Sequence, residues 1–474
     1  MDSVDLAFTP ALEQAKLIRH REVSPLQLVE LYLERIGRLN PKLGSYFTVM
    51  AEQAIADAKA KTEKLAGQGL KHTTDLPPFF GVPISIKDLN PVEGAPCSFG
   101  MRILKNRVAN FDDGVVTKIK QAGFIILGKT ATSEVGTLPY SEPKGFYPAR
   151  NPWNLDYTPG GSSGGAAAAL AAGLCAVAQG SDGGGSIRGP AFCCGLVGIK
   201  PSRGRITHAP LGDRLAGVAT NGPIGRTVAD TAALLDVMSG YVPGDPYWMP
   251  DPEPSFLAAT QQPVGPLRIA FSTELAPIGE AHPTCKQAVV DTVKLLEAMG
   301  HQVEPGCPDC SELIEPFTLI WQSILAEAGV PFFLLGDVNW WLAWRAQFCS
   351  TGKYLRAVAQ MQAIARKIVT FFDQYDALVL PVYMHPTIRV GEWAKLSPAR
   401  TLERIINWVA PCPPFNASGQ PAIAVPTGFA ANGLPVGVQI VGRPAAEATL
   451  IALAAQIEAA QPWSHHRPPL ATEG

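Results

Sequence analysis

The sequence predicts an α/β fold with a largely interior sheet, and three observations support this prediction. Hydrophobic residues make up 47% and charged residues 17% of the 474 residues, which supplies a large core and excludes an intrinsically disordered chain. Short apolar runs alternate with helical windows along most of the sequence. No repeat with a period of about 20–50 residues is visible, which excludes a solenoid. The length admits about three domains of about 150 residues or one large α/β unit.

The N-terminal part of the chain, residues 1–70, predicts helices. The second of them has the clearest signals, because Ser24 is a good N-cap and Pro25 suits the first helical position. Asn40 and Pro41 follow its expected end. The helices are expected over residues 12–20, 24–39 and 51–65.

Beyond a polar linker over residues 67–78, strand-like and helical stretches alternate. Strands are expected at residues 82–86, 124–127, 422–425 and 436–441. Helices are expected at residues 115–122 and 446–459, and a helical, aromatic-rich stretch at residues 309–388.

Charge and hydropathy restrict the partners of this chain. The 39 basic and 41 acidic residues give a net charge of −2, so no basic field collects nucleic acid or anionic lipid. Residues 1–10 lack the apolar segment of a secretory signal. The longest apolar run, residues 166–178, is too short to cross a membrane. We therefore expect a soluble, cytoplasmic protein that binds a small molecule in a pocket, with no nucleic acid and no membrane as partner.

The cysteines and histidines predict no metal site. The nine cysteines are an odd number, which is typical of reduced thiols in a cytosolic protein. Cys307 and Cys310 form a CxxC pair, but a zinc site needs a second such pair or two histidines separated by three to five residues, and neither is present. We expect a loop at this pair and no metal ion or cofactor.

Two glycine-rich motifs carry the expected chemistry: Pro-Gly-Gly-Ser-Ser-Gly-Gly at residues 159–165 and Gly-Ser-Asp-Gly-Gly-Gly-Ser-Ile-Arg at residues 180–188. Glycines let a backbone approach a reacting atom closely. Ser186, at the end of the second glycine run, occupies the place of a nucleophile. An oxyanion hole can be formed by the N–H groups of Gly183, Gly184, Gly185 and Ser186.

A serine nucleophile needs a base, and Lys87 is the candidate. No histidine lies within the two motifs, and His208 is the nearest one downstream. Lys87 ends the apolar run at residues 82–86, which predicts a buried strand. Burial disfavours the charged ammonium, and a neutral lysine can accept a proton.

Lys87 and the two motifs together resemble the amidase signature family of serine hydrolases. The similarity covers most of the chain except residues 242–409. It implies one domain over residues 1–474, with a large mixed twisted sheet covered by helices on both faces. It further implies N-terminal helices at 1–70, core motifs at 75–240, a variable substrate-pocket segment at 242–409, and a return to the core sheet with a final helix at 410–474.

The resemblance also implies the roles of individual residues. The family uses a Ser–cis-Ser–Lys triad, in which Ser186 corresponds to the acylated nucleophile, Ser162 to the bridging serine after a cis peptide bond, and Lys87 to the base. The oxyanion hole would be formed by Gly183, Gly184, Gly185 and Ser186. Supporting roles fall to Asp182 and Arg188, as an internal ion pair, and to Ser163 and Ser181, through hydrogen bonds.

Two departures from the common family pattern indicate which branch of the family this sequence resembles. Gly183 stands where a larger or hydroxyl-bearing residue is often found, and Cys193 and Cys194 are adjacent. Together with residues 200–205, they resemble the branch of 6-aminohexanoate cyclic-dimer hydrolases. This branch does not by itself determine the substrate.

The resemblance implies an amidase that cleaves a carboxylic amide C–N bond through an acyl-enzyme. The aromatic, weakly charged segment over residues 321–348 favours an apolar, aryl or aliphatic amide as the substrate, although these rings can equally serve packing alone. The same triad also suits carbamates (urethanes) or esters, and the transamidating subunit of a glutamine-dependent amidotransferase belongs to the same family. A homodimer is compatible with the sequence.

A different interpretation makes Ser162 the nucleophile. Residues 160–164 match the Gly-x-Ser-x-Gly elbow of α/β-hydrolases, with His385 or His465 as the base. It leaves Lys87 and the second glycine run without a role.

Overall fold

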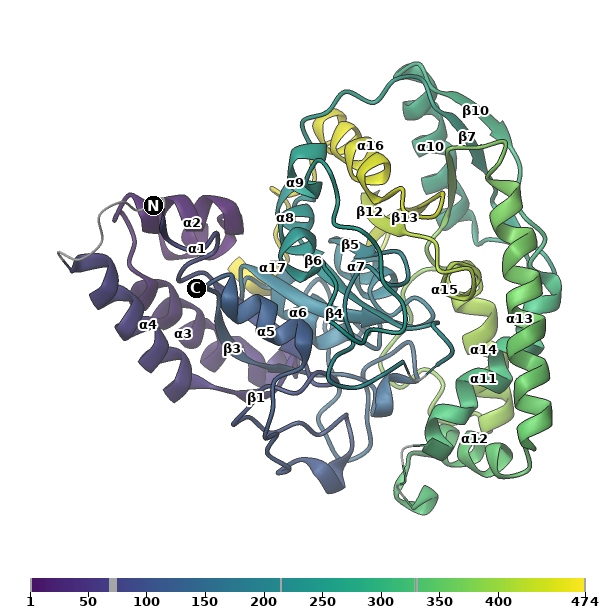
Figure 1. The fold of residues 1–474 in the computed structure, drawn as a ribbon, viewed down its shortest axis with the longest axis horizontal. Coiled ribbons are helices and arrows are strands. Elements are labelled where there is room, and N and C mark those ends of the chain that lie inside the picture. The colour runs from purple at the N-terminus through teal and green to yellow at the C-terminus, as the bar shows by residue number, and fades with distance from the viewer. Residues whose placement is uncertain (1, 68–74, 214, 328, 330, 473–474) are drawn as a thin grey trace.

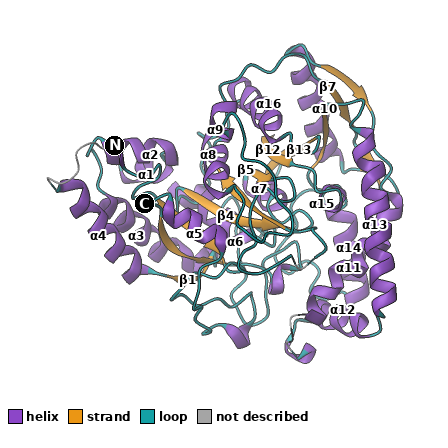
Figure 2. Ribbon diagram, in the orientation of Figure 1, coloured by secondary structure: helices purple, strands orange, loops and turns teal. Residues whose placement is uncertain are grey.

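The computed structural model describes residues 2–472 except 68–74, 214, 328 and 330. Its centre is a mixed sheet of 11 strands with helices on both faces (Figure 1 and Figure 2). The expected linker at residues 67–78 lies largely outside the described residues. No helix among the described residues combines the length and apolar character needed to cross a bilayer.

The sheet has two halves, and β12 (Ala422–Phe429) and β13 (Pro435–Gly442), which come after all the other strands in the sequence, lie between them. In sheet order they are β1 (Tyr46–Val49), β3 (Ile125–Thr130), β2 (Pro83–Lys87), β4 (Val177–Asp182), β6 (Thr220–Gly225), β5 (Val197–Lys200), β12 (Ala422–Phe429), β13 (Pro435–Gly442), β11 (Ala377–Pro381), β7 (Arg268–Phe271) and β10 (Gln302–Pro305). Strand β2 runs parallel to β3 and β4, and β7 runs parallel to β10 and β11, whereas the other pairs are antiparallel. A separate hairpin consists of β8 (Glu274–Leu275) and β9 (Gly279–Glu280).

The α-helices are distributed along the whole chain. They are α1 (Ser3–Phe8), α2 (Ala11–Arg19), α3 (Pro25–Leu43), α4 (Ala51–Ala66), α5 (Gly114–Gln121), α6 (Gly164–Ala171), α7 (Arg188–Cys194), α8 (Val228–Met238), α9 (Phe256–Ala259), α10 (Pro283–Ala298), α11 (Ile314–Glu327), α12 (Asp337–Gln347), α13 (Thr351–Phe371), α14 (Pro398–Val409), α15 (Pro413–Ala417), α16 (Glu447–Ala460) and α17 (Pro469–Thr472). Helices α7, α10 and α16 pack on β12 and β13, and α8 packs on β6.

Three features differ from the prediction. Residues 1–70 are not helical throughout, because β1 lies between α3 and α4 and pairs with β3. Helix α3 continues through Asn40 and Pro41 to Leu43, because a proline in the last turn removes only one hydrogen bond, and Gly44 then ends the helix in a left-handed conformation. The stretch at residues 309–388 is not helical throughout, since its last part contains β11. The Ala-Leu-Val-Leu-Pro sequence of β11 is fully buried between β13 and β7.

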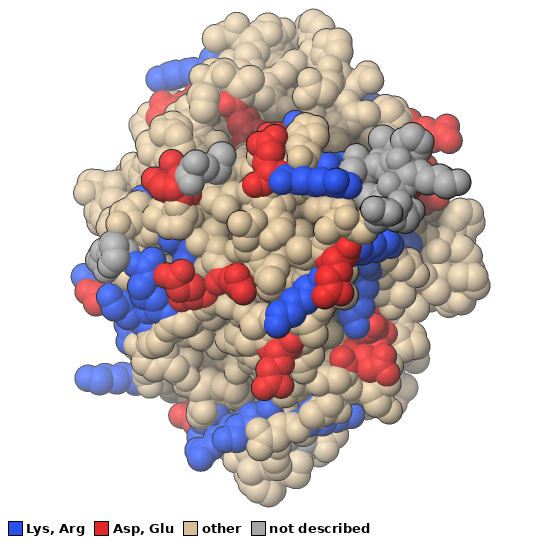
Figure 3. Space-filling view, turned by 90° about the vertical axis from the view of Figure 1, so that its left-hand side faces the viewer, with Lys and Arg blue, Asp and Glu red and all other residues tan. Residues whose placement is uncertain are grey.

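Acidic and basic side chains are interspersed on the face of the molecule that Figure 3 shows, without a large area of one sign. This distribution agrees with the net charge of −2. Such a face does not provide the extended positive field that nucleic acids require.

Arg35 of α3 connects the two ends of the chain to the central helix α6. Its side chain is buried, with 2% exposed. The guanidinium donates to the carbonyl oxygens of Gly173 at 2.9 Å, Ala172 at 3.0 Å and Ala471 at 3.1 Å. One side chain therefore satisfies the end of α6 and holds the C-terminal helix α17 against the N-terminal region.

Replacing Arg35 by Ala should lower the free energy of unfolding by about 3 kcal/mol, because it leaves buried carbonyl groups without donors. Urea denaturation followed by circular dichroism measures this change. Arg35→Lys is the matched control and should recover part of the loss, since lysine keeps the charge but lacks the forked donor geometry. An alanine variant as stable as the wild type would show that Arg35 is not needed there.

Candidate active site

The candidate site lies where two neighbouring parallel strands end. Lys87 is the last residue of β2, and Asp182 is the last residue of β4, which pairs with β2. The second glycine-rich motif follows β4 directly and leads into α7, while the first motif leads into α6. The sheet topology therefore brings Lys87 next to a motif that follows it about a hundred residues later in the sequence.

Lys87 is fully buried and contacts serines of both motifs. Its Nζ lies 2.7 Å from Ser162 Oγ, 3.0 Å from Ser181 Oγ and 3.3 Å from the Ser181 carbonyl oxygen. Burial lowers the pKa of Lys87 to about 7, although the Asp182 carboxylate acts in the opposite direction. At neutral pH a substantial fraction of this side chain is a neutral amine that can accept a proton.

Ser162 follows a cis peptide bond, as the resemblance implied for the residue at this position. The backbone here is closely packed, because a Cβ atom on Gly161 would lie 2.4 Å from the Tyr140 amide nitrogen. Ser141 Oγ donates to the Ser162 carbonyl oxygen at 3.4 Å. The Ser162 hydroxyl is thereby presented to Lys87 by a backbone with little room to move.

Ser186 is 8% exposed and lines a cavity together with Gly161 and Gly184. Its carbonyl oxygen accepts a hydrogen bond of 3.2 Å from the N–H of Ser163, the neighbour of Ser162. The two motifs are thus joined directly at their serines. In addition, Ser163 Oγ donates to the Ser181 carbonyl oxygen at 3.2 Å.

The glycine run differs in one respect from the expected convergence of four N–H groups. The N–H of Gly185 donates to Asp182 Oδ1 at 2.7 Å and is therefore occupied within the loop. Among the described residues, the N–H groups of Gly183, Gly184 and Ser186 have no such partner. These three N–H groups remain as candidate donors to a substrate oxygen.

Asp182 and Arg188 form the expected internal ion pair. Arg188 Nε and Nη2 each donate to the Asp182 carboxylate at 3.0 Å, and both side chains are fully buried. Burial by itself would raise the pKa of Asp182, but the Arg188 guanidinium and the surrounding hydrogen bonds hold it well below its usual range. The same carboxylate also accepts a hydrogen bond from the N–H of Ile187 at 3.1 Å.

Two amide side chains complete this ion pair and were not predicted. Asn416 Nδ2 donates to Asp182 Oδ1 at 2.9 Å, and Gln439 Oε1 accepts from Arg188 Nη1 at 3.0 Å. Gln439 is a polar residue in the otherwise apolar β13, which is the one signal in the sequence that could have identified it.

The histidines that the alternative interpretation requires have other partners. His385 contacts its neighbouring Pro386 carbonyl oxygen at 3.0 Å and stacks on Trp408. His465 packs against His466. In the described part of the chain, the side chain hydrogen-bonded to the Ser162 hydroxyl is Lys87.

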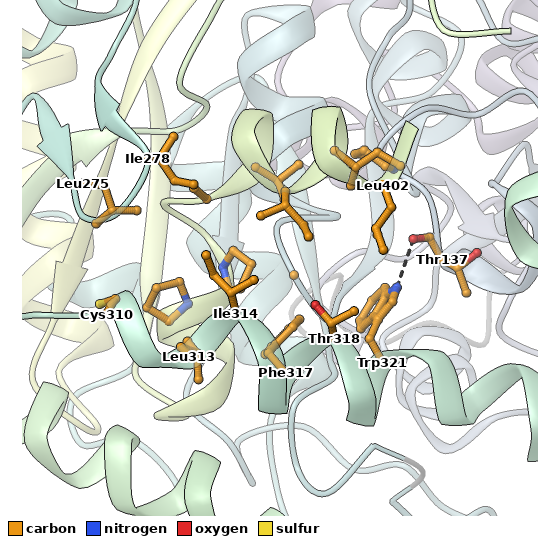
Figure 4. Close-up of a pocket in the computed structure, with 18 of the residues that line it drawn as sticks. Thr137, Leu275, Ile278, Cys310, Leu313, Ile314, Phe317, Thr318, Trp321 and Leu402 are labelled. Carbon is orange, nitrogen blue, oxygen red and sulfur yellow. Dashed lines mark hydrogen bonds between the residues drawn. The ribbon is translucent and has the colours of Figure 1, made fainter. Parts of the chain in front are cut away.

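The cavity beside Ser186 is apolar. Figure 4 shows Phe317, Thr318 and Trp321 of α11 on one side and Leu402 of α14 on the other. Trp321 Nε1 donates to the Thr137 carbonyl oxygen at 3.1 Å. None of the described residues that line this cavity is charged.

The cysteines of the structure form neither a disulfide nor a metal cluster among the described residues. All nine are free thiols, and the Cys307–Cys310 pair lies in the connection after β10, as expected for a loop. No group of three or more His, Cys, Asp or Glu residues in the described ranges is arranged to hold a metal ion.

Comparisons with known proteins show the family to which this chain belongs. The family model described as Amidase matches residues 27–451. A putative amidase of Synechocystis sp. is 53% identical over 454 residues, covering 96% of this chain and 89% of the relative. The 6-aminohexanoate-cyclic-dimer hydrolase of Pseudomonas sp. is 36% identical over 502 residues, covering 99% and 98%. A solved structure of 6-aminohexanoate cyclic dimer hydrolase with substrate bound matches with a TM-score of 0.91 and 32% identity, covering 98% of this chain and 99% of that one. The chain therefore belongs to the amidase family of hydrolases.

Proposed function

We propose that this protein hydrolyses the C–N bond of an uncharged amide through an acyl-enzyme, with Ser186 as nucleophile, Ser162 as bridging serine and Lys87 as base. The observation that carries the proposal is the 2.7 Å contact between Lys87 Nζ and Ser162 Oγ, made by a buried lysine whose pKa is lowered to about 7. A protonated lysine could not accept a proton, so the lowered pKa supports the role of base.

Acylation begins with a proton transfer along the three side chains. Neutral Lys87 takes the proton of Ser162 while Ser162 takes the proton of Ser186, and Ser186 Oγ bonds to the carbonyl carbon. The carbonyl oxygen becomes an oxyanion that accepts hydrogen bonds from the N–H groups of Gly183, Gly184 and Ser186. When the C–N bond breaks, the proton returns through Ser162 to the departing amine.

Deacylation repeats these steps with water. The water gives its proton to the Ser162–Lys87 pair and attacks the acyl carbon, and Ser186 leaves with that proton as its hydroxyl is restored. The Asp182–Arg188 ion pair takes no part in the proton transfers. Its role is to hold the loop that carries the N–H donors, through the Gly185 and Ile187 hydrogen bonds.

The apolar cavity supports an uncharged substrate, such as an aryl or aliphatic amide. A zwitterionic amino acid, which a transamidating subunit would bind, needs charged partners that the described lining does not offer. The hydrolysis of a cyclic amide by the 6-aminohexanoate-cyclic-dimer hydrolases is compatible with the same lining. Carbamates and esters present the same carbonyl to Ser186, and we propose them as secondary substrates.

Ser186→Ala should abolish turnover while leaving the fold intact, because only one buried hydroxyl oxygen is removed. A fluorophosphonate probe followed by peptide mass spectrometry should place one adduct on Ser186 of the wild type. An adduct on Ser162 instead would favour the interpretation that makes Ser162 the nucleophile.

The value of kcat/KM should rise with pH through an apparent pKa of about 7 and then reach a plateau, because Lys87 accepts a proton only after losing its own. Lys87→Ala should remove this ionisation and lower kcat/KM by about 10²–10⁴-fold. A pH profile between pH 5 and 10, with an uncharged anilide as substrate, measures both effects.

Lys200 provides the matched control for the pH profile. It is also fully buried, and burial lowers its pKa to about 7, but its Nζ donates to the Pro201 carbonyl oxygen rather than to a motif serine. Lys200→Met should keep the ionisation in kcat/KM, as should replacement of His385 or His465. If a histidine variant lost the ionisation and Lys87→Ala kept it, the base would have to be reassigned.

Prolonged incubation with a chelator should leave kcat/KM unchanged, because the proposed steps move protons and charge through side chains and backbone N–H groups alone. A loss of activity that zinc restores would contradict this mechanism. The rate before and after dialysis against the chelator is the measurement.

A further inference from the structure

The indole of Trp321 lies directly on the glycine run that follows β4. A Cβ atom on Gly183 would lie 2.8 Å from Trp321 Cζ3 and 3.1 Å from Cη2, which is closer than a side chain can approach a ring without displacing it. Position 183 is also where the sequence departs from the common family pattern. The contact gives a physical reason for the glycine, since a residue with a side chain would collide with Trp321.

The position of the indole is fixed from two sides. Trp321 Nε1 donates to the Thr137 carbonyl oxygen at 3.1 Å, and the ring stacks beside Phe317 with centroids 5.9 Å apart and an interplanar angle of 15°. Thr137 is held in turn, because its Oγ1 donates to Asn339 Oδ1 of α12 at 2.7 Å. The indole is therefore a fixed wall of the cavity.

The same wall adjoins the proposed oxyanion donors. The nearest neighbours of a Cβ on Gly184 would be Phe317 ring atoms at 3.8 and 3.9 Å, so the two α11 rings lie over two successive residues of the glycine run. Ser186 lines the same cavity. A group bonded to Ser186 and held by these N–H groups would contact the Trp321 and Phe317 rings.

The chemistry of the products assigns this cavity to the acyl side of the substrate. After the C–N bond breaks, the acyl group stays bonded to Ser186, whereas the released amine takes up a proton in water. An ammonium group is disfavoured in a cavity without charged partners, while an apolar acyl chain gains from leaving water there.

We propose that Trp321 is the specificity-determining residue of this site: it limits the acyl pocket above Gly183 and selects uncharged acyl groups of limited length. This inference rests on the proposed function. It predicts that position 183 and position 321 are coupled, since the space that a side chain at 183 requires is the space that the indole occupies.

The test measures kcat/KM for p-nitroanilides of acetic, hexanoic, decanoic and 6-aminohexanoic acid. The variants are Trp321→Leu, Gly183→Ser, the double variant, and Trp344→Leu as the matched control. Trp344 lies on α12, is 45% exposed and does not line the cavity. The wild type should prefer the hexanoyl over the 6-aminohexanoyl substrate, and Trp344→Leu should keep the wild-type order.

Trp321→Leu should move the preference toward the decanoyl substrate by about 10- to 200-fold in the ratio of kcat/KM values, the range that a methylene group is worth in an apolar pocket. Gly183→Ser should lose activity on all substrates, and adding Trp321→Leu should recover most of that loss. If the Gly183→Ser variant does not fold, the chain-length preference of Trp321→Leu by itself tests whether Trp321 limits the acyl pocket.

An unchanged chain-length preference in Trp321→Leu would overturn the inference, as would an equal loss from Gly183→Ser with and without the tryptophan. If the wild type preferred the 6-aminohexanoyl substrate, the inference that the pocket selects uncharged acyl groups would be wrong. Labelling of Ser186 by a fluorophosphonate separates these failures from failure of the mechanism, because it requires the nucleophile and its base but not the acyl pocket.

Discussion

The ion pair between Asp182 and Arg188 is the constraint on which the rest of the site depends. Two charges buried completely are stable only when every polar atom around them is satisfied, and here the partners come from the glycine loop, from Asn416 before β12 and from Gln439 of β13. A flexible run of glycines thereby becomes a loop of one conformation. The same pair ties the loop after β4 to the strands that connect the two halves of the sheet.

In the proposed function, chemistry and recognition come from different parts of this molecule. The end of β2 supplies Lys87, and the loop after β4 supplies Ser186. Ser162 comes from the loop before α6, which is packed tightly enough that Gly161 admits no side chain. The apolar wall comes from α11 and α14, both within residues 242–409. A change in the helices can alter which group fits beside Ser186 without moving Lys87 or Ser162. Under the proposed mechanism, this separation would let one set of reacting groups serve different amides.

The sequence predicts those features that have a local pattern. The strand before Lys87, the capped helix after Ser24 and the two glycine motifs each stand out within a few residues, and the structure contains all of them. Features that arise from long-range packing have no such pattern. Strand β11 is a short apolar run beside long helices, and the contact of Trp321 with Gly183 joins residues more than a hundred positions apart. The inward bond of Gly185 to Asp182 likewise depends on a loop conformation that glycine composition alone leaves open.

The strand order also bears on how the chain is made. Strands β1 to β6 form one continuous half of the sheet, and β7, β10 and β11 form the other, but the two halves meet only through β12 and β13 at residues 422–442. A nascent chain on the ribosome therefore carries two partial sheets with open edges until residues 422–442 emerge, and such edges favour pairing with other chains. Gln439 lies in this segment and Asn416 lies just before it, so both partners of the Asp182–Arg188 ion pair are also synthesised after the two partial sheets. Until that segment has folded, Asp182 and Arg188 lack these two partners, and the loop that carries the candidate N–H donors is held less firmly.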